Sequence, residues 1–210
     1  MWRASPAARP RLAARRIGLH LAAGMRVGLY GGSFDPAHAG HAHVARTALR
    51  RLGLDRVIWL AAPRNPLKPA KAAHSLAARL EGAARQARGP SMIVSDLEAR
   101  LGSRHTIDTV RWLKARFPRV HFVWIMGADS LAGFHRWKGW ADLMAEIPVA
   151  VVSRPSFAIK SRHSPAARRF AHARQPQAAA RTLPLSRPPA WVYLTAPFRP
   201  VSSTDLRDCA

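Results

Sequence analysis

The chain has 210 residues, of which 48% are hydrophobic, and this suits a single domain with a core of its own. Its formal net charge is +23, mostly from arginines that are spread along the chain without interleaved aromatic side chains. This distribution favours a solvated basic surface and an anionic small-molecule substrate, while a basic nucleic-acid-binding protein stays open as an alternative. The apolar runs are too short for a membrane-spanning helix.

The two ends of the chain bear on its compartment and its domain boundaries. Residues 1–24 hold five arginines and no acidic residue, and we expect a disordered tail or a stretch ahead of a start at Met25. The folded domain is then expected over residues 25–210. Cys209 is the single cysteine, which excludes an intrachain disulfide and indicates a cytoplasmic protein.

From Met25 onwards, short apolar runs alternate with helical patterns. In chain order, the sequence predicts strand 25–30, helix 41–52, strand 56–61, helix 75–87, strand 91–94, helix 106–116, strand 120–126, helix 137–145, strand 147–152 and strand 191–195. Ser75 and Thr106 are suitable N-caps for their helices. Residues 153–190 are rich in Arg, Pro and Ala, and we expect no chemistry there beyond a short helix over 165–173.

This alternation predicts an α/β fold with a parallel sheet covered by helices on both faces. The nearly continuous apolar character of the strands agrees with burial on both faces. In such sheets, ligands bind beyond the carboxyl ends of the strands. We therefore expect the functional residues in the segments that directly follow strands.

The segment Gly31–His41, GGSFDPAHAGH, follows the first strand and leads into the first helix. Gly31 and Gly32 allow backbone to approach a ligand closely, and free N–H groups at a helix start bind phosphate. His38 and His41 form an HxGH pair whose imidazoles can donate hydrogen bonds to phosphate oxygens. A glycine turn with incidental histidines explains either half of this pattern, but not both halves in this order.

The segment Ser202–Arg207, SSTDLR, is the second candidate phosphate site. Ser202, Ser203 or Thr204 can cap a short helix whose free N–H groups face a phosphate. Arg207 lies one turn further and offers a forked set of donors. Taken alone, an ordinary capped turn with a solvated arginine explains this segment better.

Together, the two segments resemble the signatures of the HxGH nucleotidyltransferases: GGSFDPAHAGH is similar to their nucleotide-binding motif, and SSTDLR to their SSTxxR motif. The resemblance runs in order from Met25 to about Arg207 and implies a Rossmann-like fold. It implies that His38, His41 and Arg207 stabilise charge on a transferring phosphate, with Mg²⁺ carried by ATP. The implied ATP-binding residues are Gly31, Gly32, Ser33, Phe34, His38, His41, Gly127, Asp129, Ser202, Ser203, Thr204 and Arg207.

Two further segments resemble those of bacterial nicotinate-nucleotide adenylyltransferases. In GADSLAGFHRWKGW, Asp129 can accept hydrogen bonds from ribose hydroxyls, and Trp137 is placed to stack on a pyridine ring, although core packing explains a tryptophan equally well. In SRHTIDT, the resemblance implies that backbone N–H groups near Thr106 bind the nicotinate carboxylate. His105 stands where that family has tyrosine.

The loop PRNPLKP follows the second strand and is a weaker candidate. Asn65 and Lys68 can reach substrate phosphates there, but a solvated proline-rich loop is nearly as good an explanation.

The resemblance thus implies transfer of AMP from ATP to nicotinate mononucleotide in NAD biosynthesis, without a specific nucleic acid or a membrane as partner. Phosphopantetheine adenylyltransferase shares the first motif and stays open as an alternative, against which the HTIDT and WKGW segments argue. The oligomeric state is left open.

Overall fold

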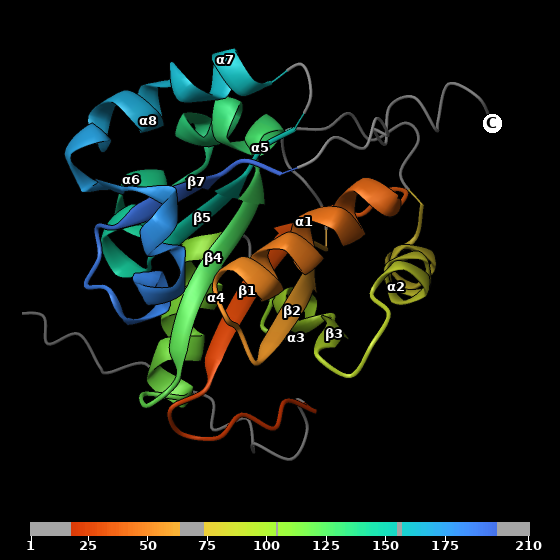
Figure 1. The fold of residues 1–210 in the computed structure, drawn as a ribbon. Helices are drawn as coiled ribbons and strands as arrows, with labels where there is room; N and C mark the ends of the chain where they lie inside the picture. The colour runs from red at the N-terminus through yellow and green to blue at the C-terminus, as the bar shows by residue number, and fades with distance from the viewer. Residues whose placement is uncertain (1–17, 64–73, 104, 155–156, 197–210) are drawn as a thin grey trace, which may run out of the picture.

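The computed structural model describes residues 18–63, 74–103, 105–154 and 157–196. Within them, seven strands form one parallel sheet in the order β3-β2-β1-β4-β5-β7-β6 (Figure 1). The strands are β1 (Arg26–Gly32), β2 (Arg56–Ala61), β3 (Met92–Ser95), β4 (His121–Gly127), β5 (Val149–Val152), β6 (Arg174–Gln175) and β7 (Trp191–Leu194). Because every strand pair is parallel, all carboxyl ends lie at one edge of the sheet.

Helices cover both faces of this sheet, as the alternating pattern predicted. One face packs against α1 (Ala39–Arg51), α2 (Leu76–Gln86) and the 3₁₀ helix η5 (Gln177–Leu185). The other face packs against α3 (Leu97–Arg100), α4 (Thr106–Arg116), α5 (Ala128–Gly133), η3 (Phe134–Arg136), α6 (Trp140–Glu146) and α8 (Pro165–Arg169). The helix α7 (Ala158–Arg162) and the turn η4 (Ala171–Ala173) adjoin α8.

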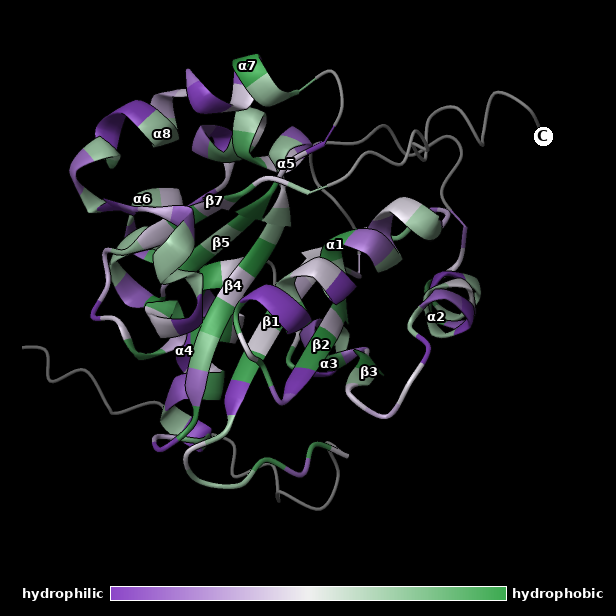
Figure 2. Cartoon of the chain, in the orientation of Figure 1, coloured by the Kyte–Doolittle hydropathy of each residue, from purple (hydrophilic) through white to green (hydrophobic). Residues whose placement is uncertain are grey.

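The strands are nearly continuous apolar runs because both of their faces are buried. Along β1, Leu29 points into one core and Tyr30 into the other, and both are at most 4% exposed. In register, Tyr30 pairs with Trp59 of β2 and Ile125 of β4. The hydropathy colouring shows the same arrangement, with apolar strands between helices that mix polar and apolar residues (Figure 2).

Helix starts follow local capping, and the structure corrects one expected cap and one expected start. Ser75 caps α2 as predicted, since its Oγ accepts a hydrogen bond from the Ala78 amide at 3.2 Å. Thr106 is the first residue of α4 and not its cap, which is His105 without a side-chain capping bond. The helix expected from 137 begins at Trp140, because Gly139 precedes it with φ of +68°, a left-handed conformation that cannot be part of an α-helix.

The boundary expected at residue 25 is also too late. Leu19 is 7% exposed and belongs to the core, and the Gly24 amide donates to the Arg119 carbonyl at 2.7 Å. Residues from Gly18 onwards are therefore part of the fold and not of a disordered tail. Among the described residues, no helix is both long and apolar enough to cross a membrane.

Candidate active site

The carboxyl ends of β1 and β4 form the switch point of the sheet. From β1 the chain continues outwards through β2 and β3, and it then returns to β4 on the other side of β1. In open parallel sheets, a crevice that binds ligands forms at such a point. The HxGH segment follows β1 here, and the segment with Asp129 follows β4 (Figure 1).

The two histidines of HxGH form the start of α1. His38 is the N-cap residue, and its Nδ1 accepts a hydrogen bond from the Gly40 amide at 3.0 Å. The Nδ1 of His41 accepts from the His38 amide at 3.2 Å, so the pair forms a capping box, and the ring centroids lie 3.9 Å apart. An accepting Nδ1 puts the proton of a neutral imidazole on Nε2. Both rings are thus set to donate through Nε2 from a helix N-terminus.

The glycines before this pair have a packing role that was not expected. A Cβ on Gly31 would overlap the indole ring of Trp124, and a Cβ on Gly32 would lie 3.0 Å from the ring of Phe34. The packing of these aromatic rings against β1 therefore explains the glycines without any ligand. Phe34 is itself 1% exposed and packs edge-on against His41, with ring centroids 5.2 Å apart. Of the predicted ATP contacts of Phe34, only those of its backbone fit this position.

On the β4 side, Asp129 faces a cation that sequence reasoning missed. Its Oδ2 lies 3.4 Å from Nη1 of Arg154, which follows β5, while its Oδ1 is buried without a hydrogen-bond partner among the described residues. Burial raises the pKa of the neighbouring Tyr30, and the charge of Arg154 acts in the opposite direction. Arg154 belongs to residues 153–190, where no chemistry was expected, and the structure places it beside a predicted site residue; its only signal in the sequence was its place after a strand.

The predicted acceptor side lies near the start of α4. Ser103 Oγ donates to the His105 carbonyl at 2.9 Å and accepts from Thr109 Oγ1 at 3.0 Å, which fixes the chain as it enters the helix. His105 Nδ1 lies 3.4 Å from a carboxylate oxygen of Asp108. A Cβ on Gly139 would lie 3.1 Å from Ile107, so the WKGW segment packs against α4.

Trp137 connects this side to β1. Its ring packs edge-on against Trp124 at a centroid distance of 6.3 Å, and Trp124 is the ring that occupies the space beside Gly31. Trp137 is half-buried, so core packing accounts for part of its surface. Trp140 packs instead against Phe170, at a centroid distance of 5.9 Å, on the side of α8.

Six predicted site residues lie outside the described residues: Asn65, Lys68, Ser202, Ser203, Thr204 and Arg207. Within the described part, no group of three or more His, Cys, Asp or Glu side chains is arranged to hold a metal ion.

Sequence reasoning also missed Arg79, which is 6% exposed on α2. A charged residue on the apolar side of a helix, next to Leu80 and one turn before Ala83, was the available signal.

Comparison with known proteins agrees with this arrangement. Residues 29–209 match the cytidylyltransferase-like family. A probable nicotinate-nucleotide adenylyltransferase of Caulobacter sp. (strain K31) is 64% identical, over 87% of this chain and 97% of that protein. A probable nicotinate-nucleotide adenylyltransferase of Cereibacter sphaeroides (strain ATCC 17025) is 53% identical, with the same coverage.

Solved structures show the same fold at low sequence identity. The nicotinic acid mononucleotide adenylyltransferase of Plasmodium falciparum, complexed with NaAD, superimposes with a TM-score of 0.65 over 87% of this chain and 82% of that chain, at 18% identity. The fold is therefore the Rossmann-like one that the sequence motifs implied. The chain belongs to the cytidylyltransferase-like family and, within it, to the bacterial nicotinate-nucleotide adenylyltransferases.

Proposed function

We propose that this protein transfers AMP from ATP to nicotinate mononucleotide, which gives nicotinate adenine dinucleotide and pyrophosphate. The observation that carries the proposal is the HxGH capping box at the switch point between β1 and β4. It occurs in a chain that is 64% identical to a probable nicotinate-nucleotide adenylyltransferase. With its single cysteine and its place in NAD biosynthesis, the protein is proposed to be cytoplasmic.

The reaction needs no nucleophilic side chain. A phosphate oxygen of nicotinate mononucleotide attacks the α-phosphorus of ATP in line, a new P–O bond forms, and the bond to the pyrophosphate leaving group breaks. The protein contributes by holding both substrates and by stabilising charge on the transferring phosphate. His38 and His41 donate to that phosphate through Nε2, and we propose that Arg207 supplies a third set of donors.

The acceptor is recognised on the other side of the switch point. Trp137 stacks on the pyridine ring, and the N–H groups at the start of α4 near Thr106 and His105 donate hydrogen bonds to the nicotinate carboxylate. Asp129 accepts hydrogen bonds from ribose hydroxyls, for which its buried Oδ1 is suited. Asn65 and Lys68 are proposed to contact substrate phosphates.

Magnesium is proposed to enter as part of the ATP substrate. Mg²⁺ prefers oxygen ligands in an octahedral arrangement, and the described residues do not form such a cage. Histidines at the transferring phosphate are poor ligands for this ion, which agrees with their assignment as hydrogen-bond donors.

The test is pyrophosphate release with Mg-ATP and one acceptor at a time. Nicotinate mononucleotide is expected to be the best of three acceptors, ahead of nicotinamide mononucleotide and phosphopantetheine. Turnover with phosphopantetheine alone would establish the other adenylyltransferase. No turnover with any acceptor, together with salt-sensitive binding of a DNA or RNA oligonucleotide, would instead favour the nucleic-acid-binding alternative.

A further inference from the structure

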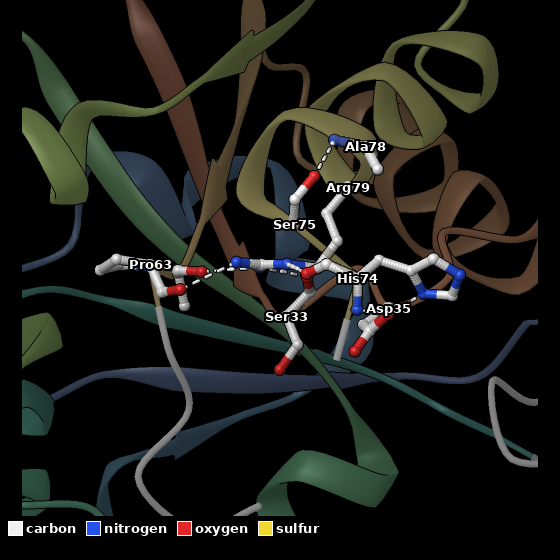
Figure 3. A network of polar contacts seen from close by, with 8 residues as sticks. Ser33, Asp35, Pro63, His74, Ser75, Ala78 and Arg79 are labelled. Atoms are coloured by element: carbon white, nitrogen blue, oxygen red, sulfur yellow. Dashed lines mark hydrogen bonds and ion pairs between the residues drawn. The ribbon is translucent and has the colours of Figure 1, made fainter. Parts of the chain in front are cut away.

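Behind the loop that follows β1, one buried arginine contacts four backbone carbonyls (Figure 3). Nη1 of Arg79 donates to the carbonyl oxygens of Ser33 at 2.8 Å and Ala62 at 2.7 Å. Its Nη2 donates to Pro63 at 2.9 Å, and its Nε donates to His74 at 3.2 Å. Arg79 thus joins three places in the chain: the loop after β1, the end of β2 and the residues before α2.

Asp35 attaches the same loop to this network a second time. Its Oδ1 lies 2.6 Å from His74 Nδ1 and accepts from the His74 amide at 3.3 Å. Asp35 is 6% exposed, whereas the His74 side chain lies at the surface and is 57% exposed, so this contact is partly buried. The loop is therefore held at Ser33 by Arg79 directly and at Asp35 through His74, whose own carbonyl is bound to Arg79.

Between these two attachment points lies a strained residue. Phe34 has φ of +49°, a left-handed conformation that residues other than glycine rarely adopt. Such a conformation persists only where the surroundings hold it, and here the bonds of Ser33 and Asp35 do so. The Phe34 ring in turn packs edge-on against the ring of His41, with an interplanar angle of 74°. The contacts thus lead without a break from Arg79 to His41.

We propose that Arg79 is a positioning residue for adenylyl transfer, which acts by fixing the Ser33–Asp35 turn and thereby the imidazole of His41. This inference rests on the proposed function. The planar guanidinium binds its four carbonyls in fixed directions, whereas a lysine ammonium is a compact donor on a flexible stem. Lysine at this position keeps the charge and loses the geometry, and arginine is therefore required for the rate and not only for the fold.

A double-mutant cycle between Arg79→Lys and His41→Ala separates positioning from stability. Turnover is measured with radiolabelled ATP and saturating nicotinate mononucleotide, and circular dichroism establishes the folded fraction at the assay temperature. Alone, Arg79→Lys is expected to lower kcat about 10- to 100-fold, as displacement of a reacting group typically does. On the His41→Ala background it is expected to lower kcat less than about threefold, because the group that Arg79 positions is gone.

Arg85→Lys is the matched control on the same helix. Arg85 is exposed and pairs with Glu81 at 2.6 Å, so its replacement is expected to leave kcat unchanged. Three results would overturn the inference: near-native kcat of Arg79→Lys, an equal fall of kcat on both backgrounds, or failure of both Arg79→Lys and Arg79→Gln to fold. Absence of turnover in the native chain would instead refute the proposed function, and with it the role of Arg79.

Discussion

Replacing His41 by alanine is expected to remove a helix-capping hydrogen bond and a hydrogen-bond donor to the transferring phosphate. The structure allows the effect of each loss to be estimated separately. The first is the capping bond, in which Nδ1 accepts from the His38 amide at 3.2 Å. Loss of an N-terminal capping bond costs about 1 kcal/mol of stability, which lowers the Tm of a chain of this size by about 2–4 °C. Since a typical domain is stable by about 5–15 kcal/mol, almost all of the variant stays folded.

The second is the Nε2 donor at the transferring phosphate. A single preorganised donor of this kind contributes about 100- to 1000-fold in rate, far more than the change in folded fraction can explain. The assay is kcat for pyrophosphate release, measured beside a thermal denaturation curve. Ser164→Ala is the control, because it removes a capping bond of the same length, 3.2 Å, at α8 and no proposed catalytic group. A folded His41→Ala variant with near-native kcat would refute the assignment.

Other measurements test other parts of the proposal. Nicotinate mononucleotide should exceed its amide in kcat/KM by about 10- to 100-fold, because the N–H groups near Thr106 leave the amide nitrogen without an acceptor, and equal values would contradict this. A chain that begins at Met25 should keep its kcat but lose about 1.5–3 kcal/mol of stability with Leu19, whereas one that begins at Gly18 should keep both; a folded but inactive Met25 chain would show an unexpected role for residues 1–24. Burial raises the pKa of Glu98 from its ordinary 4.5 to about 7. The folded chain is fully stable with respect to this group below about pH 4.5, where Glu98 is neutral, and it loses this stability as the pH rises through about 7. The Tm of Glu98→Gln should therefore exceed the native Tm by more at pH 8 than at pH 5, and an equal difference at both pH values would contradict this.

The sheet was largely predictable because its strands are buried on both faces. The strand expected over 56–61 is β2 to the residue, and the other expected strands lie within two residues of β1, β3, β4, β5 and β7. A doubly buried strand is an apolar run with polar residues on either side, and this pattern is visible without tertiary information. β6 consists of only Arg174–Gln175 and has no such run, so only its pairing with β7 defines it.

The candidate site was predictable where a motif directly follows a strand and not elsewhere. The HxGH pair lies where its place after β1 predicted, at the start of α1. Arg79 and Arg154 belong to no motif. In an arginine-rich chain, the apolar neighbours of Arg79 and the place of Arg154 after a strand are too weak as signals to select these two residues. What distinguishes Arg79 is the set of carbonyls brought together by the ends of β1 and β2, and that set exists only in the folded chain.

The position of the two histidines couples the fold of α1 to the proposed chemistry. Each ring uses Nδ1 to accept a backbone N–H, and this bond both completes the helix start and selects the tautomer that donates through Nε2. A side chain that caps equally well, such as serine or aspartate, would satisfy the helix but offers no comparable donor on its far side. Histidine meets both demands at once, which explains on physical grounds why a helix begins with two of them where a phosphate is proposed to bind.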